Sequence, residues 1–251
     1  MEGPLPHEVM ALSNLVRLNL ENNRLVGTVP SEGLRKFTLL KELNLANNQL
    51  VGTIPVEMTT LPAIEILEFL RNQIRGTLPK EIIQLTKLTT LTVSWNEFTG
   101  TIPIEFFRLN QFTEFEFGRN RFTGTLPTEV GLLTAITSIA LFGNQIGGTI
   151  PSELGQLTKI TNMQLADNLF EGTIPTEIGA MTKLSKLSFS YSNVSGTVPT
   201  EFSQLTDLNK LFLQDTNIVG NLTFICDIGE FDVFRSDLDE VIECACCTCC
   251  A

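Results

Sequence analysis

The chain has 251 residues, 43% of them apolar, so it is long enough to bury a sizeable core. Its formal net charge is −11, with 17 Lys and Arg residues against 28 Asp and Glu residues. Because nucleic acids and anionic membranes are bound through clusters of Lys and Arg, this balance argues against both as partners. The first ten residues include Glu2 and two prolines and lack the apolar core of a signal peptide. We also expect no transmembrane segment in the chain.

A tetrapeptide of the form Gly-Thr-x-Pro recurs along the chain with a spacing of 24 residues, apart from one step of 25. A fixed period of this length predicts a solenoid, in which each unit buries its apolar side against its neighbours. The glycines of the tetrapeptide are Gly27, Gly52, Gly76, Gly100, Gly124, Gly148, Gly172 and Gly196, and a degenerate copy follows at Gly220.

A second pattern precedes each of these glycines, as in LKELNLANNQLVGTIP at residues 40–55. Its alternating leucines lie on one face of a short strand, so stacked units place parallel strands side by side. Phe98, Phe122 and Phe170 share an inward position two residues after a recurring asparagine, and we expect them to stack in the core. That asparagine is Asn23, Asn48, Asn72, Asn96, Asn120, Asn144 or Asn168, and the last two units replace it with Ser192 and Thr216.

The combined pattern, L-x-x-L-x-L-x-x-N-x-L followed by x-G-x-I-P, resembles the plant-type leucine-rich repeat over about residues 3–224. The resemblance implies an α/β solenoid, a right-handed superhelix with a parallel β-sheet on its concave face and short helical or 3-10 turns on its convex face. It divides the chain into a solenoid of about nine units at 1–224, the first one truncated, and a Cys-rich C-terminal cap or tail at 225–251. The asparagines would form a buried ladder whose amides satisfy backbone groups.

A glutamate stands two residues after the proline of each unit. Stacked carboxylates could suggest a stripe that binds cations, but an acidic residue at the start of a convex turn also favours free backbone N–H groups. We therefore interpret these residues as structural. They are Glu8, Glu32, Glu57, Glu81, Glu105, Glu129, Glu153, Glu177 and Glu201.

The sequence contains few of the residues and motifs that catalytic sites require. The only histidine is His7, and there is no nucleotide-binding loop and no zinc-protease motif. We therefore predict a protein that is not an enzyme and that has no catalytic residue, no metal site and no cofactor.

The two ends of the chain depart from the repeat. Residues 3–8, GPLPHE, already align with the interior of a unit, so we expect that the parent protein has further sequence upstream. The tail holds all six cysteines and resembles the cysteine-stapled cap of extracellular leucine-rich repeat proteins. Because adjacent cysteines bridge poorly, the resemblance favours a disulfide from Cys226 to the tail, with Cys244 as first choice. The other cysteines could form further bridges, bind a thiophilic metal or link chains.

Two sequons, at Asn193 and Asn221, predict glycosylation and are compatible with secretion. The resemblance likewise implies an extracellular or cell-surface location.

Trp95, the only tryptophan, stands directly before the asparagine of its unit. Stacking at about 4.8 Å per unit places Arg71 and Arg119 on either side of it. A guanidinium beside an exposed indole contributes about 0.5–1 kcal/mol, and Trp and Arg are favoured anchors of interfaces. The alternative is that the arginine stems merely shield the tryptophan. The whole column is Asn22, Asn47, Arg71, Trp95, Arg119, Gly143, Asp167, Tyr191 and Asp215.

We predict a ligand-contact surface centred on this trio and extending over strand positions that face away from the leucine core. The added residues are Glu68, Thr92, Glu116 and Phe142. The resemblance to receptor-like and inhibitor proteins implies a non-enzymatic recognition module, a fragment of a secreted or receptor-like protein. Such a module would bind a protein, peptide or glycan through its concave or lateral face.

Two alternatives belong to other classes of protein. One is a structural cell-surface protein. The other is binding to ice or to a crystal surface through the threonines that follow the repeat glycines. These are Thr28, Thr53, Thr77, Thr101, Thr125, Thr149, Thr173 and Thr197.

Overall fold

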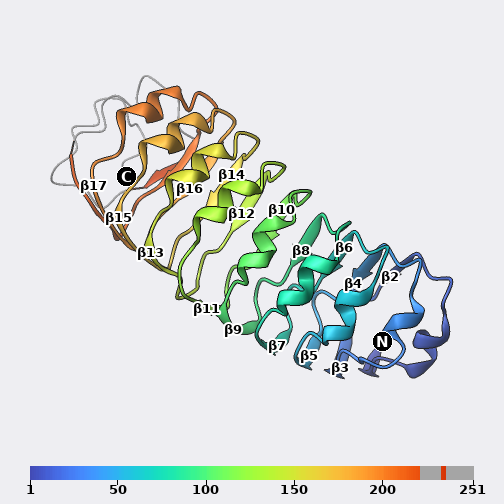
Figure 1. Cartoon of the computed structure of the whole chain (residues 1–251). Coiled ribbons are helices and arrows are strands. Elements are labelled where there is room, and N and C mark those ends of the chain that lie inside the picture. The colour runs from blue at the N-terminus through green and yellow to red at the C-terminus, as the bar shows by residue number, and fades with distance from the viewer. Residues whose placement is uncertain (221–232, 236–251) are drawn as a thin grey trace. The chain divides into compact units, whose positions relative to one another are not determined.

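The computed structural model describes residues 1–220 and 233–235 of the chain. The chain forms two compact units, Met1–Thr123 and Gly124–Ala251, and each is described by itself. Both consist of stacked coils in which a short strand, a second extended segment and a 3-10 turn recur (Figure 1).

The first unit contains two rows of parallel strands, and strands of one row pair with the equivalent residues of the neighbouring coils. The first row is β2 (Arg17–Asn19), β4 (Glu42–Asn44), β6 (Ile66–Glu68), β8 (Thr90–Thr92) and β10 (Glu114–Glu116). The second row is β1 (Glu2–Pro4), β3 (Arg24–Thr28), β5 (Gln49–Gly52), β7 (Gln73–Gly76), β9 (Glu97–Thr101) and β11 (Arg121–Thr123).

The second unit repeats this arrangement. Its first row is β12 (Ser138–Ala140), β14 (Asn162–Gln164), β16 (Lys186–Ser188), β18 (Lys210–Phe212) and β20 (Val233–Arg235). Its second row is β13 (Gly147–Thr149), β15 (Leu169–Thr173), β17 (Asn193–Gly196) and β19 (Asn217–Ile218). All of the pairings within these two rows are parallel.

Short 3-10 helices close the coils. In most coils the turn starts directly after the repeat proline, whose fixed φ and missing N–H suit this position. The turns of the first unit are η1 (His7–Ala11), η2 (Leu34–Lys36), η3 (Val56–Thr60), η4 (Lys80–Gln84) and η5 (Ile104–Arg108). Those of the second unit are η6 (Thr128–Leu132), η7 (Ser152–Gln156), η8 (Thr176–Ala180) and η9 (Thr200–Gln204).

The recurring glutamates occupy the first turn of these helices, as predicted, apart from Glu32, which precedes η2. Within the described part of the chain, no helix has the length and apolar character needed to cross a membrane. The parallel rows and short turns confirm the predicted leucine-rich repeat solenoid.

The core is built from the inward residues of both rows. Phe98, Phe122 and Phe170 are fully buried, as predicted. In the first unit the rings of Phe98 and Phe122 stack with centroids 5.9 Å apart and planes 6° apart. At the inward position two residues after the ladder asparagine, these two coils therefore carry a phenylalanine where the repeat pattern has a leucine.

The asparagine ladder is also confirmed. The amide nitrogen of Asn120 donates to Val93 O of the preceding coil at 3.0 Å and to Phe117 O of its own coil at 3.2 Å. Its Oδ1 accepts from the N–H of Phe98 at 3.0 Å. Asn48, Asn72, Asn96 and Asn168 bond in the same way. Each asparagine thus ties its coil to the one before it.

The recurring Gly-Thr pair has a packing role that the sequence did not reveal. Gly100 has a φ of 75°, and a Cβ at this position would lie 2.8 Å from Cγ2 of Thr77 in the preceding coil. The methyl group of one coil's threonine therefore packs against the glycine of the next. The same contact recurs in both units, for example between Thr149 and Gly172.

Several predictions fall outside the described residues. They are the disulfide between Cys226 and Cys244, the sequon at Asn221 and the boundary between 1–224 and 225–251. All of them stay predictions.

Candidate ligand-binding surface

Trp95 follows strand β8 by three residues, and its side chain is 46% exposed. The guanidinium carbons of Arg71 and Arg119 lie 5.8 and 5.4 Å from the centroid of its ring. The structure thus brings the three residues together as the repeat spacing predicted. Contact of two guanidinium groups with one indole is favourable by about 0.5–1 kcal/mol each at an exposed site.

The backbone at Trp95 is left-handed, with a φ of 59°. Residues other than glycine are disfavoured in the left-handed region by about 1–2 kcal/mol, and among them Asn and Asp tolerate it best. The rest of the column is left-handed as well, with Arg71 at 52° and Arg119 at 54°. Strained residues of this kind often mark functional positions, and bulky Arg and Trp side chains are unusual here.

Backbone hydrogen bonds hold this conformation in place. The N–H of Trp95 donates to Gly118 O at 2.9 Å, and the carbonyl of Trp95 accepts from the N–H of Asn72 at 3.1 Å. The coil therefore fixes the backbone from both sides. The side chain takes no part in these hydrogen bonds, so they do not require a tryptophan at this position.

Glu68, Thr92 and Glu116 form a neighbouring row on strands β6, β8 and β10, where they are paired in register. The two glutamates are half-buried. Thr92 is only 8% exposed, so the expectation that it faces solvent is wrong. Strands lie about 4.8 Å apart, and the threonine side chain is shorter than the glutamate side chains paired with it in register, so it reaches less far toward solvent.

Burial is the largest cause that raises the pKa of Glu68 above its usual value, and repulsion from Glu42 and Glu21 adds to it. Burial and the nearby Glu114 likewise raise the pKa of Glu116. Burial is the larger cause of both shifts, and the secondary repulsion comes from other carboxylates near this strand face, which favours a cationic group in contact with it.

Phe142 belongs to the second unit, two residues after β12, and is half-buried. Its place in the surface around Trp95 stays a prediction.

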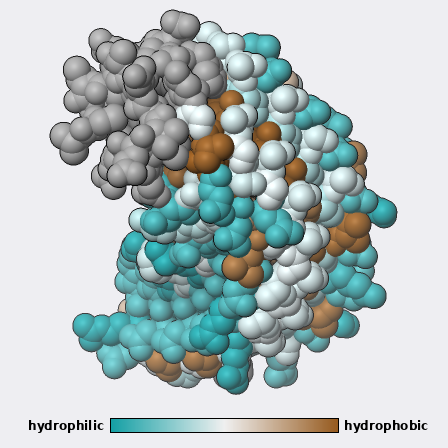
Figure 2. All heavy atoms as spheres, turned by 90° about the vertical axis from the view of Figure 1, so that its left-hand side faces the viewer, coloured by the Kyte–Doolittle hydropathy of each residue, from teal (hydrophilic) through white to brown (hydrophobic). Residues whose placement is uncertain are grey.

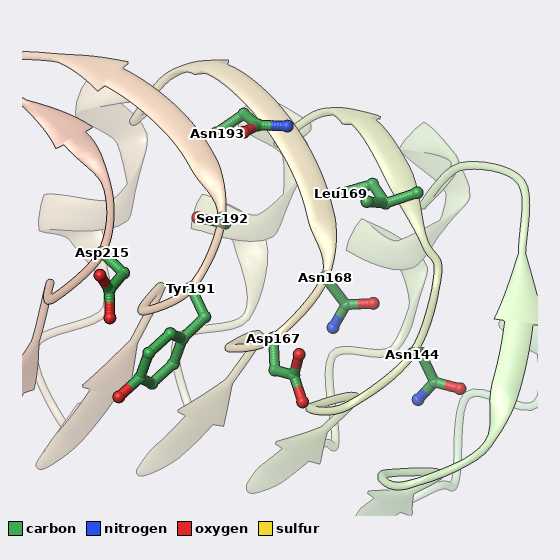
Figure 3. A pocket seen from close by; sticks show the side chains of 8 residues that line it. All are labelled: Asn144, Asp167, Asn168, Leu169, Tyr191, Ser192, Asn193 and Asp215. Carbon is green, nitrogen blue, oxygen red and sulfur yellow. The ribbon is translucent and has the colours of Figure 1, made fainter.

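A second group of charged and aromatic residues lies in the same column in the second unit, and the sequence analysis did not predict it as a site. Asp167, Tyr191 and Asp215 are left-handed as well, with φ values of 54°, 56° and 52°. They line a shallow hollow of about 310 Å³, and Figure 3 shows Tyr191 between the two carboxylates. The signal that could have found it is the one used for Trp95, a charged residue on either side of an aromatic residue.

Asn193, the sequon inside the described region, also lines this hollow and has an exposed side chain. Glycosylation of Asn193 stays a prediction. Across residues 1–220, no group of three or more His, Cys, Asp or Glu side chains is arranged to hold a metal ion.

Figure 2 shows a face of the molecule on which hydrophobic residues are scattered among polar ones. Exposed apolar side chains such as Val26, Val56 and Leu169 stand on different coils. Because single exposed apolar residues are normal in soluble proteins, they do not identify a binding surface. The two column sites are distinguished instead by an aromatic side chain that has a charged residue on either side in the column.

The profile of the Leucine Rich Repeat family matches residues 14–36, 39–61 and 87–109. The plant peptide hormone receptor RGFR1, solved in complex with RGF2, is 32% identical with a TM-score of 0.88, and the match covers 92% of this chain and 37% of the receptor chain.

The LRR ectodomain of the plant membrane receptor kinase GASSHO1/SCHENGEN3 from Arabidopsis thaliana, in complex with CASPARIAN STRIP INTEGRITY FACTOR 2, is 30% identical with a TM-score of 0.86. That match covers 90% of this chain and 27% of the ectodomain, so the chain spans well under half the length of either receptor structure.

A plant ice-binding protein is 24% identical with a TM-score of 0.72, with 88% of this chain and 70% of that chain covered, and it shares the fold alone. A search of curated protein sequences gives no match.

Proposed function

We propose, from the premise that this chain is a leucine-rich repeat protein of the plant type, that it is a recognition module for a peptide or an extended protein segment. One similar structure is that of a plant peptide hormone receptor in complex with RGF2, which supports a ligand of this class. Another is an ectodomain of a membrane receptor, which supports an extracellular or cell-surface location.

The observation that carries the proposal is the trio of Arg71, Trp95 and Arg119. Nearly half of the tryptophan surface is exposed, although an indole gains most from burial. Its backbone is left-handed, a conformation that Asn, as found at Asn22 and Asn47, adopts at lower cost. Neither exposure nor strain helps folding, so a contact with a partner is the better explanation.

The charges around the trio suggest the character of the partner. The arginines favour an acidic or aromatic group against the tryptophan. The crowded carboxylates of Glu68 and Glu116 favour a basic group on the adjacent strand face. A segment that carries both kinds of residue a few positions apart would satisfy both rows.

A peptide display library offers a test that does not depend on knowing the natural ligand. Peptides selected on the wild-type protein would be measured against Trp95→Asn, which keeps a residue suited to the left-handed backbone. We expect at least about fivefold weaker binding, the level at which an interface residue counts as more than neutral. The matched control is Val56→Asn, an exposed apolar residue on the convex turn η3, which should bind as the wild type does. Equal affinity of the selected peptides for Trp95→Asn would rule out the trio as the contact.

The threonine ladder motivates a second proposal, binding to ice. Its residues are exposed and regularly spaced along the second row of strands in each unit. However, within each unit the threonine methyl groups pack against glycines of the next coil, which gives them a structural role that needs no ice surface. Thermal hysteresis of the purified protein that disappears in Thr101→Lys would favour ice binding over peptide recognition.

A further inference from the structure

We propose that Lys186 and Lys210 form a second contact site, on the strand face of the second unit, and that this site takes an acidic side chain of an extended peptide. The proposal rests on the peptide-recognition function proposed above and adds the class of residue that this face accepts. The pair shares no residue with the trio of Arg71, Trp95 and Arg119, so either site can be right when the other is wrong.

The pair arises from the repeat. Lys186 on β16 and Lys210 on β18 occupy the same outward position in successive coils, and the two residues pair in register. Neighbouring strands lie about 4.8 Å apart, so two like charges stand side by side. Like charges directly opposite each other on adjacent strands destabilise a sheet. The pair therefore lowers the stability of the fold, and folding alone does not account for it.

The ammonium group of Lys186 is held in place on this face. It donates to Oε1 of Gln164 on β14 at 2.9 Å and lies 5.8 Å from the ring centroid of Phe212 on β18. The side chain thus contacts the strands on both sides of its own. A lysine ammonium has three N–H donors, and the bond to Gln164 uses one of them. A ligand with a strong acceptor can use the others.

The charge of the pair is not balanced by an acidic side chain in the described part of the chain. Within residues 1–220 and 233–235, neither Lys186 nor Lys210 forms an ion pair. Burial is the largest cause that lowers the pKa of Lys186, and the charge of Lys210 adds to it. An anionic group in contact with the pair would offset both effects.

The rest of the strand face adds no acidic residue. The other outward residues of β12, β14, β16 and β18 are uncharged: Ser138, Ala140, Asn162, Gln164, Ser188 and Phe212. In the first unit, the outward strand residues include Glu42, Glu68, Glu114 and Glu116. The two units therefore present opposite charge on this face, and that of the second unit attracts anions although the chain has a net charge of −11.

An acidic side chain fits the pair better than the end of a peptide chain does. Strand pairing continues from β16 to β14 on one side and from β18 to β20 on the other, so the face extends past the pair in both directions. An extended segment can therefore cross the pair without ending on it. The half-buried ring of Phe212 offers an apolar contact to a neighbouring residue of the same segment.

Three short peptides test the charge and the source of the ligand group. The probe acetyl-Ala-Ala-Glu-Ala-Ala-amide would be titrated to about 50 mM into isotope-labelled protein, which detects a contact of millimolar affinity. We expect the backbone amide signals of β16 and β18 to shift and saturate, and the affinity to fall at high salt. The same peptide with Gln in place of Glu should leave these signals unchanged. So should the Gln peptide with a free C-terminal carboxylate.

Variants test the two lysines. Lys210→Gln should weaken binding of the Glu peptide about two- to fivefold, as expected for one exposed ion pair. It should not lower the denaturation midpoint, because it removes a repulsion. The matched control is Lys183→Gln, an exposed lysine in the turn before β16, which should bind the peptide like the wild type. Trp95→Asn should also bind it like the wild type, which separates this site from the trio.

The proposal is overturned if the Gln peptide shifts the signals as the Glu peptide does, if Lys210→Gln binds like the wild type, or if nothing shifts. An equal loss in Lys183→Gln would indicate a general attraction between charges and would overturn it as well. Equal or larger shifts with the free-carboxylate Gln peptide would make the pair a site for the end of a chain, against the assignment made here.

Discussion

Asn120→Ala tests how the coils of the first unit are held together. Asn120 is 9% exposed, and its amide reaches two coils. It donates to Val93 O at 3.0 Å, Phe117 O at 3.2 Å and Gly118 O at 3.3 Å. Its Oδ1 accepts from the N–H of Phe98 at 3.0 Å. Alanine removes all of these bonds and supplies no side-chain donor or acceptor in their place.

The expected loss of unfolding free energy follows from the number of hydrogen bonds that the Asn120 amide makes. The amide has two N–H hydrogens shared among three carbonyls, so it makes about two full-strength donations and one acceptance. At about 0.5–1.5 kcal/mol for each bond, and with the buried Phe98 N–H left without its acceptor, the expected loss of unfolding free energy is about 2–4 kcal/mol. Asn120→Ser should lose somewhat less, because a serine at the equivalent Ser192 still donates to Phe189 O.

Denaturant unfolding of the purified protein measures this loss, and amide hydrogen exchange locates it. The exchange rate of the Phe98 N–H should rise more than that of its neighbours in β9. The control is Glu105→Gln in turn η5, an acidic residue in the first turn of a helix, which should cost no more than about 0.3–1 kcal/mol. If Asn120→Ala costs no more than Glu105→Gln, or if Phe98 exchange is unchanged, the ladder is not what ties these coils together.

Three further predictions concern residues outside the ladder. Trp95→Asn loses two guanidinium contacts of about 0.5–1 kcal/mol each and gains about as much from relief of backbone strain, so stability should stay within about 1 kcal/mol of the wild type; a loss above about 3 kcal/mol in denaturant unfolding would mean that the indole serves the core. Gly100→Ala should cost about 2–4 kcal/mol through its positive φ and the contact with Thr77, and less in the presence of Thr77→Ser; additive losses would contradict the methyl contact. Glu116→Gln should raise the denaturation midpoint at about pH 7, because a raised pKa means that the folded protein loses stability as pH rises above the unfolded value, and the gain should vanish near pH 4; a gain that is independent of pH would point to packing instead.

The repeat made most of the fold predictable from sequence. Once the period was fixed, the inward phenylalanines, the asparagine ladder and the place of Arg71 and Arg119 beside Trp95 followed from stacking, because each depends only on the position of a residue within its unit. The first row of strands also followed from the alternation of leucines. These features are set locally and then copied from coil to coil.

Other features could not be predicted because they depend on dimensions within the coil. The left-handed backbone at Trp95 arises from how the chain turns out of β8, and no composition rule assigns it to a tryptophan. The burial of Thr92, which is only 8% exposed although it pairs in register with two half-buried glutamates, does not follow from its position in the repeat. The contact of Thr77 with Gly100 joins two coils at a distance that the sequence pattern does not encode.

The left-handed column also has a consequence for protein engineering. Its backbone is fixed by main-chain hydrogen bonds, as at Trp95, so the side chain at each coil can be exchanged without rebuilding the core. Asparagine, already present at Asn22 and Asn47, is the neutral choice, and each departure from it adds a chemical group at a spacing of about 4.8 Å. A new binding specificity could therefore be engineered by substituting this one position in successive coils.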